Sequence, residues 1–409
     1  MNKYLQKTIR LNLFWQFAAA SIILIVALPS SASEIGFNKN RPNAERQQPD
    51  FQGQTRAPVI QDTLQIEKTT FAKDLKHPWG MVQLPNGSWL VTERPGRLRL
   101  VSSHGEISKP IIGLPVVDAR GQGGLLDVTV QKDFSKTRRI WWSYAEPREG
   151  GKNGTSVATG KLSSDGASLS DVKVIFRQTP AWDSTYHFGS RLVFDRTGAL
   201  FITTGERSYG EASKLSQDIT THLGKILRIN PEGGAAAGNP NIKSGLPEIW
   251  SWGHRNVQAA TLGLNGALWT VEHGPRGGDE LNRPEAGLNY GWPVITYGEN
   301  YDGSPVNNGI TKKSGMEQPL YYWDPVIAPS GMTFYNGNQF PHWRGSILIG
   351  GLASRSLVRL VMDKNRVIGE ARYLQGQARI RDVKNTHDGA IMILTDSNSG
   401  TMTKLAPKQ

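Results

Sequence analysis

Hydrophobic and polar positions repeat one pattern along most of the chain, from about Pro58 to about Leu405. A polar turn that contains glycine leads into a short apolar run, as in residues 84–92 (LPNGSWLVT). Three further copies keep this order, at residues 194–203, 264–270 and 388–395. Two less regular copies lie between them, at residues 136–142 and 343–349. Such short runs, bounded by turn residues, are typical of buried β-strands rather than of helices.

Each copy predicts a small antiparallel meander, because Asn-Gly and Asp-Gly turns favour two-residue hairpins. Second strands follow at residues 97–101, 224–229 and 357–360. A single meander cannot bury both faces of its sheet, whereas a closed ring of meanders can, and it leaves only short edges. Six copies therefore predict an all-β fold, a six-bladed β-propeller of four-stranded antiparallel blades. A pair of β-sandwiches is the alternative architecture.

No linker interrupts the pattern, so residues 58–409 are expected to form one propeller domain. The copies are unevenly spaced, and the distances are longest between the third, fourth and fifth. Extra loops are expected there, and loops carry function on scaffolds of this kind.

The first residues have the layout of a secretory signal peptide. Lys3, Lys7 and Arg10 precede an apolar run at residues 17–28, and small residues follow at 29–33. The run is short for a membrane span, and an uncleaved N-terminal anchor is the alternative. We therefore expect residues 1–33 to be a signal peptide that is removed and residues 34–57 to form a flexible polar tail. The protein is expected to be periplasmic, with no membrane span after cleavage.

Composition and charge narrow the range of partners. The 45 Gly and 23 Pro suit many tight turns. The chain has no Cys, so stability must come from burial or from bound metal rather than from disulfides. The formal net charge of +12 arises from scattered Lys and Arg, not from a dense basic run. We therefore expect no nucleic-acid partner, and instead a basic pocket for an anionic ligand.

Three segments at the ends of predicted strands carry side chains suited to a binding site. Gln122 lies in a glycine-rich loop whose backbone can approach a flat ligand closely. His187 precedes a predicted strand, and histidine suits a general base because it titrates near neutral pH. Arg255 and Asn256 place a planar cation beside an amide, which suits carboxylate or quinone oxygens. Taken singly, each of these residues is equally compatible with a structural role.

Two further features indicate bound ions. Acidic side chains are mixed with Gly and Asn at residues 272–280, 289–293 and 299–302, and calcium prefers such oxygen-rich surroundings. If residues 379–382 form a strand, Arg379 and Arg381 point the same way and Asp382 faces the other way. Two guanidinium groups on one face repel unless an anion lies between them or acids neutralise them. This pair is the strongest physical indication of an anionic site.

Taken together, seven ordered motifs resemble the soluble PQQ-dependent aldose sugar dehydrogenases, in the glucose/sorbosone dehydrogenase family. They are HPWGM at 77–81, GQGGLLDV at 121–128, HFGSRLVFD at 187–195, GHRN at 253–256, EHGPRGGDELN at 272–282, NYGWP at 289–293 and RIRDV at 379–383. The resemblance covers about residues 75–405. It implies an oxidoreductase that oxidises the anomeric C1 hydroxyl of an aldose to the lactone. Hydride would pass to pyrroloquinoline quinone (PQQ), and electrons would then pass to an external acceptor.

The resemblance also implies roles for individual residues. His187 matches the general base, and Glu206 is an acid in a position to orient it. Arg255 matches the arginine near the reacting quinone oxygen, where it would stabilise growing negative charge. The implied cofactor contacts are Gln122, Arg255, Asn256, Arg379 and Arg381. Gly274 and Pro275 match carbonyl ligands of a calcium ion beside PQQ, and a second, structural calcium site is matched by Glu280, Tyr290, Glu299 and Tyr301.

One stretch departs from the family pattern. The family usually has a lysine that reaches the cofactor after the strand at residues 347–352. Here the matching residues are Gly351, Leu352, Ala353, Ser354 and Arg355. We expect Gly351, Leu352 and Ala353 to lie at the cofactor, with Arg355 as the candidate replacement for the lysine.

Two other functions fit parts of the sequence. A calcium-dependent lactonase would need a carboxylate-rich metal site at the axis, whereas the candidates that face the axis are Arg and His. A non-catalytic or PQQ-deficient binding propeller would fit the missing lysine, but the retained His187 and Arg255 oppose it. Trp182, Tyr186 or Tyr209 could each stack on a pyranose. The preferred sugar, the electron acceptor and the oligomeric state, monomer or homodimer, are left open.

Overall fold

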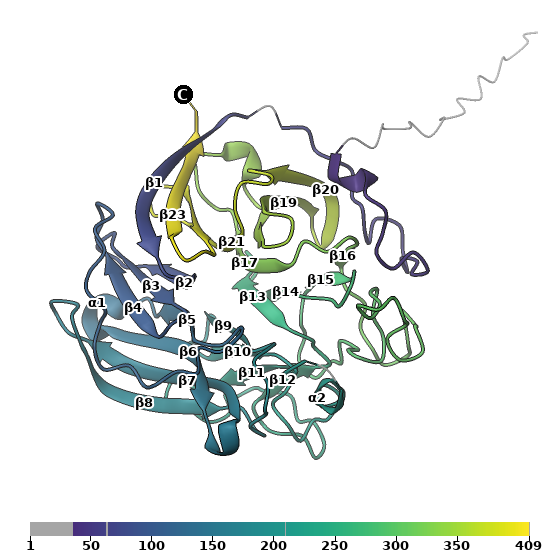
Figure 1. Ribbon diagram of the computed structural model, residues 1–409, viewed down its shortest axis with the longest axis horizontal. Helices are drawn as coiled ribbons and strands as arrows, with labels where there is room; N and C mark the ends of the chain where they lie inside the picture. Colours follow the sequence, from purple (N-terminus) through teal and green to yellow (C-terminus); the bar gives the residue numbers. More distant parts are fainter. Residues whose placement is uncertain (1–35, 63, 209, 409) are drawn as a thin grey trace, which may run out of the picture.

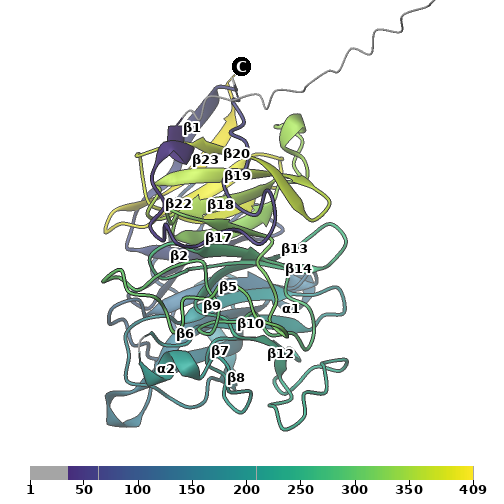
Figure 2. The same cartoon turned by 90° about the vertical axis from the view of Figure 1, so that its right-hand side faces the viewer.

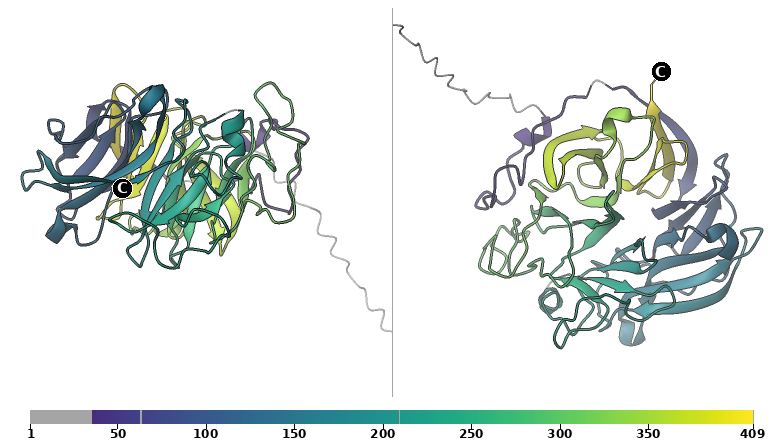
Figure 3. Two further views of the ribbon diagram at one scale, coloured as in Figure 1. Left: turned by 90° about the horizontal axis from the view of Figure 1, so that it is seen from below. Right: turned by 180° about the vertical axis from the view of Figure 1, so that it is seen from behind.

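The computed structural model describes residues 36–62, 64–208 and 210–408. In these residues, short strands form six antiparallel sheets that follow one another around a central axis (Figure 1). The ring is seen from its two faces in Figure 1 and in the right panel of Figure 3, and from its side in Figure 2. The predicted all-β, six-bladed propeller is confirmed. The expected signal peptide lies outside the described residues.

The blades are numbered here in chain order. Blade 1 contains β2 (Pro78–Gln83), β3 (Trp89–Glu93) and β4 (Arg97–Val101), and blade 2 contains β5 (Leu125–Val130), β6 (Arg139–Pro147), β7 (Asn153–Leu162) and β8 (Leu169–Arg177). Blade 3 contains β9 (Gly189–Phe194), β10 (Leu200–Thr204), β11 (Lys225–Ile229) and β12 (Ile249–Trp252), and blade 4 contains β13 (Val257–Leu262), β14 (Leu268–Glu272), β15 (Asp279–Asn282) and β16 (Tyr321–Trp323). Blade 5 contains β17 (Pro329–Phe334), β18 (Ile347–Gly351), β19 (Ser356–Asp363) and β20 (Arg366–Tyr373), and blade 6 contains β21 (Ile380–Asn385), β22 (Ile391–Thr395), β23 (Gly400–Pro407) and β1 (Ile66–Leu75). The helices of the described residues are single turns: η1 (Gly36–Lys39), α1 (Phe134–Thr137), η2 (Glu149–Gly151), α2 (Glu211–Lys214) and η3 (Pro341–Trp343).

The innermost strands form a closed ring around the axis. They are β2, β5, β9, β13, β17 and β21, and each contacts the innermost strands of both neighbouring blades. Blade 6 closes the ring with strands from both ends of the domain. In this blade β1 pairs antiparallel with β23, Ile66 lying opposite Pro407 and Leu75 opposite Gly400. Closure removes the sheet edges that an open array of blades would leave.

Blade 1 is the exception to the predicted four strands, because its sheet has three. Residues 106–111 run beside β4, but only Val101 and Ile107 form a regular bridge there. The Leu100 N–H donates to Ser108 Oγ (3.0 Å) instead of to a backbone carbonyl. Pro110 follows shortly afterwards and has no N–H to donate. These two features prevent residues 106–111 from pairing with β4 as a fourth strand.

The hydrophobic core lies between neighbouring blades. In one cluster, Trp269 and Val271 of β14 pack with Met332 of β17 and Ile349 of β18. The apolar runs that the sequence pattern marks as strands are buried along their length, as in β3 and β10. No helix in the described part of the chain has the length and hydropathy of a membrane span.

In the stretch expected to form a flexible tail, residues 34–57, the described residues make several contacts with blade 4. The backbone N–H groups of Asn43 and Ala44 donate to the Asp324 carboxylate (2.6 and 2.9 Å). Arg56 donates to the Asp324 carbonyl (2.9 Å), and Thr55 bridges to Tyr322 of the edge strand β16. The polar residues that suggested disorder therefore form hydrogen bonds with backbone and carboxylate groups at a sheet edge.

Two long connections lie where the uneven spacing of the repeats predicts extra loops. Residues 205–224 join β10 to β11, and residues 283–320 join β15 to β16. They meet through Gln217, whose Nε2 donates to the Trp292 carbonyl (2.7 Å) and whose Oε1 accepts from Asn289 (2.7 Å). The two connections therefore contact each other beside blades 3 and 4.

Candidate functional site

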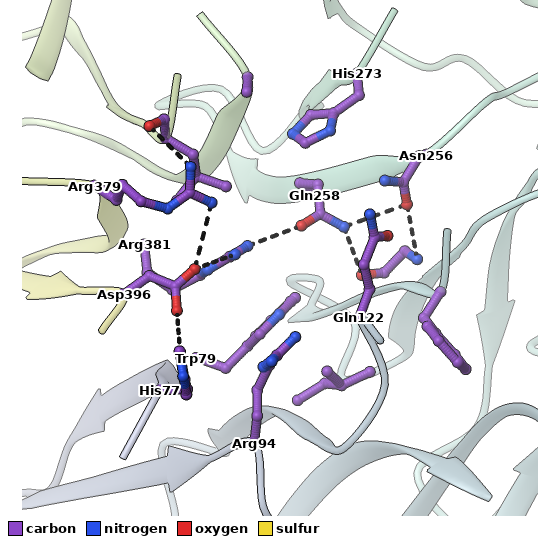
Figure 4. A pocket seen from close by; sticks show the side chains of 15 residues that line it. His77, Trp79, Arg94, Gln122, Asn256, Gln258, His273, Arg379, Arg381 and Asp396 are labelled. Atoms are coloured by element: carbon purple, nitrogen blue, oxygen red, sulfur yellow. Dashed lines mark hydrogen bonds and ion pairs between the residues drawn. The ribbon is translucent and has the colours of Figure 1, made fainter. Parts of the chain in front are cut away.

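A cavity of about 440 Å³ lies on the axis, and its lining residues occupy recurring positions in the blades (Figure 4). In five blades the residue directly before the innermost strand lines it: His77, Phe188, Asn256, Ala328 and Arg379. In four blades the residue directly after the second strand does so: Arg94, His273, Leu352 and Asp396. Both positions lie at the same end of an antiparallel pair, and therefore on one face of the disc. The remaining lining residues are Trp79, Gln122, Leu126, Gly189, Gln258 and Arg381.

One end of the cavity, called here the arginine end, is basic. Arg379 and Arg381 both face Asp396, at 3.6 and 3.0 Å, and His77 Nδ1 contacts the same carboxylate at 2.8 Å (Figure 4). Burial opposes ionisation of Asp396, but the charge of Arg381 and the contact with His77 lower its pKa below the usual range. With Arg94, the cavity lining contains three guanidinium groups and one carboxylate. Arg379 and Arg381 thus lie beside each other, and the acid that both contact is Asp396.

Unpartnered donors mark the walls of the cavity. The Nε atoms of Arg94 and Arg381, which line the cavity, and of Arg255, which lies next to the lining residue Asn256, are buried and have no hydrogen-bond partner among the described residues. A buried donor without an acceptor carries a desolvation cost. Together with the excess of positive charge, these donors suit an anionic ligand with several acceptor oxygens.

Beside the other end of the cavity, which Gln122, Phe188 and Asn256 line and which is called here the histidine end, lies a buried acid–base pair. His187 Nδ1 lies 2.7 Å from Glu206 Oε2, and the same oxygen accepts from the Ser208 N–H (2.7 Å). Because an ionised carboxylate only accepts, the His187 proton resides on Nδ1, and Nε2 is left as an acceptor. Only 7% of His187 is exposed. Burial lowers its pKa and Glu206 opposes that shift, while the charge of Arg255 lowers the pKa further.

Backbone contacts position His187. Its N–H donates to the Gln122 side chain (2.9 Å), and its φ of 48° places it in the left-handed region. Gly205 on the neighbouring strand connection approaches so closely that a Cβ there would lie 2.0 Å from the His187 carbonyl oxygen. Glycine at 205 is therefore required for the turn that presents the imidazole.

Arg255 and Asn256 are held between blades 3 and 4. The Arg255 N–H donates to Glu272 (2.7 Å), and its guanidinium donates to the Gly274 carbonyl (2.7 Å). Asn256 Oδ1 accepts from the Gly189 N–H (3.1 Å), which ties Asn256 to the start of β9. The structure thus brings together the sequence-predicted Gln122, His187, Glu206, Arg255 and Asn256.

The stretch that departs from the family pattern is only partly at the cavity. Leu352 lines it, and the Leu352 carbonyl accepts from Arg379 (3.3 Å). Gly351 is the last residue of β18, and Ala353 lines a separate hollow of about 460 Å³. Arg355 is exposed and donates weakly to the Gln377 carbonyl (3.4 Å), outside the cavity lining. The expectation that Arg355 replaces the lysine is therefore wrong, and Arg94 is the additional cation.

The predicted calcium ligands fall into two groups. Glu280 lies opposite Glu272 across β14 and β15, and Asn282 Nδ2 donates to both carboxylates (3.0 and 3.1 Å). Burial and the charge of Glu272 raise the pKa of Glu280 well above its usual value. The Gly274 carbonyl accepts from Arg255, and Pro275 lines a hollow beside Glu206.

The remaining predicted ligands lie on the connection between β15 and β16. The Tyr290 ring stacks on His254 with centroids 4.9 Å apart. Glu299 exchanges backbone hydrogen bonds with Arg276 and also pairs with its side chain (3.1 Å). Tyr301 is 61% exposed. Nowhere in the described chain do three or more His, Cys, Asp or Glu side chains cluster as metal ligands would, so a calcium ion here would depend on backbone carbonyls.

Two carboxylates on the axis correct the expectation that only Arg and His face it. Asp127 of β5 and Asp382 of β21 both pair with the buried Arg191, at 3.0 and 3.4 Å. Asp382 faces away from the cavity, as predicted, and accepts from the Met81 N–H (3.1 Å). Arg191 pairs with both acids and Lys384 lies 3.9 Å from Asp382, so the two acids do not form the open carboxylate site that a lactonase needs.

Several cavity residues were not identified from the sequence: His77, Trp79, Arg94, Gln258, His273 and Asp396. His77 and Trp79 belong to the HPWGM motif, which carried no chemical role in the sequence analysis. His273 follows β14, and its Nε2 contacts the Pro329 carbonyl (2.7 Å). Burial lowers its pKa to about 3, so this imidazole is neutral. The signal that could have found these residues is their position at or just before the start of the first strand of a blade, or directly after its second strand.

Comparisons with known proteins agree with this geometry. The glucose/sorbosone dehydrogenase family model matches residues 75–404. The chain is 43% identical over 341 residues to the aldose sugar dehydrogenase YliI of Escherichia coli (strain K12), covering 82% of this chain and 91% of that protein. The crystal structure of the soluble aldose sugar dehydrogenase from Escherichia coli in its apo form superposes with a TM-score of 0.79 at 40% identity, covering 84% of this chain and 100% of that one. The PQQ-bound aldose sugar dehydrogenase from Streptomyces coelicolor superposes with a TM-score of 0.70 at 25% identity, covering 86% and 100%.

The fold, the cavity and these relatives define a β-propeller oxidoreductase that acts on sugars. Within that class, the chain belongs to the glucose/sorbosone dehydrogenase family.

Proposed function

We propose that this protein is a PQQ-dependent aldose sugar dehydrogenase. It oxidises the anomeric C1 hydroxyl of an aldose to the lactone and passes the electrons to an external acceptor. The observation that carries the proposal is the 2.7 Å contact between His187 and Glu206 beside a cavity with three arginines. The PQQ-bound relative from Streptomyces coelicolor supports the choice of cofactor.

The residues of the cavity fit PQQ, which is a flat tricarboxylate. Arg94, Arg379 and Arg381 supply positive charge for the carboxylates, and two of them have buried Nε atoms without a partner among the described residues. Gln122 and Asn256 add amide groups at the other end. The cavity volume of about 440 Å³ lies in the range of small-molecule sites. When bound, PQQ would supply the two-electron oxidant that the protein itself lacks.

The protein residues supply acid–base chemistry and fixed charge. His187 takes the proton of the anomeric hydroxyl at Nε2, because Glu206 keeps the ring proton at Nδ1. Glu206 also stabilises the imidazolium that this proton transfer forms. Arg255 is fixed by the Gly274 and His273 carbonyls, and it stabilises negative charge that develops at the cofactor's reacting oxygen.

Calcium is part of the proposal. Two carboxylates, Glu272 and Glu280, face each other with one amide between them, and a cation would offset their repulsion. Carbonyl groups of Tyr290, Glu299 and Tyr301 are the further proposed ligands of this ion. Gly274 and Pro275 are proposed to hold a second calcium ion near the cofactor. Export to the periplasm through residues 1–33 and an unidentified electron acceptor complete the proposal.

Reconstitution tests the proposed function. The purified protein is incubated with PQQ and calcium, and aldose oxidation is followed with an artificial electron acceptor. We expect activity with PQQ and none with nicotinamide cofactors. Lactone hydrolysis without PQQ, in place of aldose oxidation, would favour the lactonase. Saturable PQQ binding without any oxidation would favour a binding propeller.

A further inference from the structure

A buried arginine beside the histidine end has no part in the chemistry proposed above. Arg207 directly follows Glu206 in the chain and is 0% exposed. Its Nη2 donates to the Ser184 carbonyl (2.6 Å) and to the side-chain oxygen of Asn153, both of which are neutral acceptors. Burying a cation among neutral groups costs free energy, and such costly arrangements are typical of functional sites.

Arg207 contacts the backbone segment that presents the imidazole. Its Nη1 donates to the His187 carbonyl in a long hydrogen bond (3.4 Å), and its Cζ lies 3.6 Å from the centroid of the Phe188 ring. The φ of 48° at His187 is unusual for a residue with a side chain, so this conformation needs support from its neighbours. The Gln122 side chain accepts from the N–H of His187, and Arg207 holds the carbonyl side of the same residue.

The same guanidinium joins three segments around the site. Arg207 belongs to the connection between β10 and β11, Asn153 is the first residue of β7, and Ser184 lies in the connection between β8 and β9. Asn153 is itself fixed, because its Nδ2 donates to Asp118 (2.8 Å). The connection between β8 and β9 contains His187, so Arg207 holds this connection against two neighbouring segments.

The charge of Arg207 also acts on the imidazole. Burial lowers the pKa of His187, and Glu206 opposes this shift. The charges of Arg255 and Arg207 lower the pKa further. His273, which also interacts with His187, is neutral because burial lowers its pKa to about 3. Burial lowers the pKa of Arg207 to about 9, so its guanidinium is charged at neutral pH.

We propose that Arg207 is a positioning residue for the general base: it holds His187 through its carbonyl and through the Phe188 ring, and it places a fixed positive charge beside the imidazole. This inference rests on the proposed function, in which His187 takes the proton of the sugar. Arg207 lines neither the axial cavity nor the hollow beside Glu206, so it acts only through other residues. Loss of its contacts frees the imidazole, whereas loss of its charge makes the imidazole more basic.

Two substitutions separate the contacts from the charge. Arg207→Gln removes both, so kcat should fall about tenfold and the acidic limb of the kcat/KM profile should move to higher pH by about half a pH unit. Arg207→Lys keeps the charge but not the planar contacts, so kcat should fall while the acidic limb stays in place. In both variants, KM for the sugar and the dissociation constant for PQQ should change less than about threefold.

Arg228→Gln is the matched control. Arg228 is also buried and lies 5.9 Å from the centroid of the Phe201 ring. It pairs with Asp195 (2.8 Å) in the turn between β9 and β10, at the end of these strands opposite the cavity. Its substitution removes a buried, hydrogen-bonded arginine from the same blade, and it should change neither the kcat nor the acidic limb.

A titration without cofactor or turnover completes the test. NMR of the PQQ-free protein with labelled histidine follows the protonation of His187, whose signal is assigned by its loss in His187→Ala. We expect His187 to titrate at higher pH in Arg207→Gln than in the wild type. An unshifted titration in Arg207→Gln would overturn the inference.

Arg207→Lys keeps the inference testable if Arg207→Gln does not fold, because an unchanged kcat in Arg207→Lys would also overturn it. A wild-type protein that oxidises no aldose would instead overturn the proposed function on which the inference rests. In that case the NMR titration still reports whether Arg207 acts on His187.

Discussion

The two ends of the axial cavity are built on different electrostatic principles. At the arginine end, Arg379 and Arg381 face the single carboxylate of Asp396 and Arg94 also lines the cavity, so positive charge is in excess. At the histidine end, a neutral imidazole pairs with Glu206, and Arg255 is fixed by backbone carbonyls and Glu272. Excess charge favours binding of an anion, whereas a balanced pair favours movement of a proton.

This contrast indicates that binding and chemistry are divided between the two ends. Substitutions at the arginine end should change the affinity for the cofactor, and substitutions at the histidine end should change the rate. The division can be tested because residues at each end can be substituted separately, and PQQ affinity and kcat can be measured for each variant.

The largest expected effect is at His187. His187→Ala removes the general base, so kcat should fall about a thousandfold. The dissociation constant for PQQ should stay within about threefold of wild type, because the arginine end is intact. Steady-state kinetics and absorbance titration measure the two quantities on the same preparation. His104→Ala, an exposed histidine, is the control. A comparable loss of PQQ affinity in His187→Ala would contradict the division.

Glu206→Gln should have the next largest effect. The amide cannot hold the His187 proton at Nδ1 as firmly, so kcat should fall about a hundredfold. The pH profile sharpens this test. Burial lowers the pKa of His187 below 6.5, so wild-type kcat/KM should rise with pH only below that value and be level at neutral pH.

The carboxylate of Glu206 opposes the lowering of the His187 pKa, so its removal lowers this pKa further. The acidic limb of the profile in Glu206→Gln should therefore move to lower pH, while the plateau falls. An acidic limb that stays in place, or moves to higher pH, would be inconsistent with direct coupling of the two residues.

Arg379→Ala probes the arginine end with a smaller effect. The Arg379 side chain is 49% exposed, so solvent screens its attraction for a PQQ carboxylate. The dissociation constant for PQQ should therefore rise about tenfold in this variant. With saturating PQQ, kcat should recover to near the wild-type value. Arg355→Ala is the matched control, since Arg355 lies outside the cavity lining, and it should leave PQQ affinity unchanged. Equal effects of the two substitutions would argue against the arginine end as the binding site.

The smallest effect concerns Glu280, which lies opposite Glu272 and does not line the axial cavity. If calcium binds there, chelation should lower Tm by about 5 °C in a thermal unfolding scan. Glu280→Gln should remove most of this response while PQQ titration still reports binding at the arginine end. A Tm that is insensitive to chelator, or a full response retained in Glu280→Gln, would contradict the assignment of Glu280.

The sequence predicts the blades well because each is a local unit. The glycine-containing turns and the apolar runs that follow them identify strands such as β3 and β10, and the motifs identify His187 and Arg381. Arg94 and Asp396 were missed because their role depends on ring closure, which brings the ends of strands from different blades together. Their position directly after the second strand of a blade marks them only once the ring of blades is known.

Two of the expectations that differ from the structure do so for a similar reason. Composition suggested a flexible tail, but Asn43 and Arg56 have long-range partners around Asp324 that composition cannot show. Arg355 resembled a replacement for the missing lysine in the linear order. The turn after β18 instead exposes Arg355 and leaves Leu352 at the cavity.

The central claim is that the arginine end holds PQQ, and one titration tests it most directly. Wild-type apoprotein and the double variant Arg379→Ala/Arg381→Ala are titrated with PQQ while its absorbance is recorded. We predict saturable one-to-one binding by the wild type, and a dissociation constant at least about a hundredfold higher for the double variant. Wild-type protein that fails to bind PQQ, or a double variant that binds it equally well, would contradict the account.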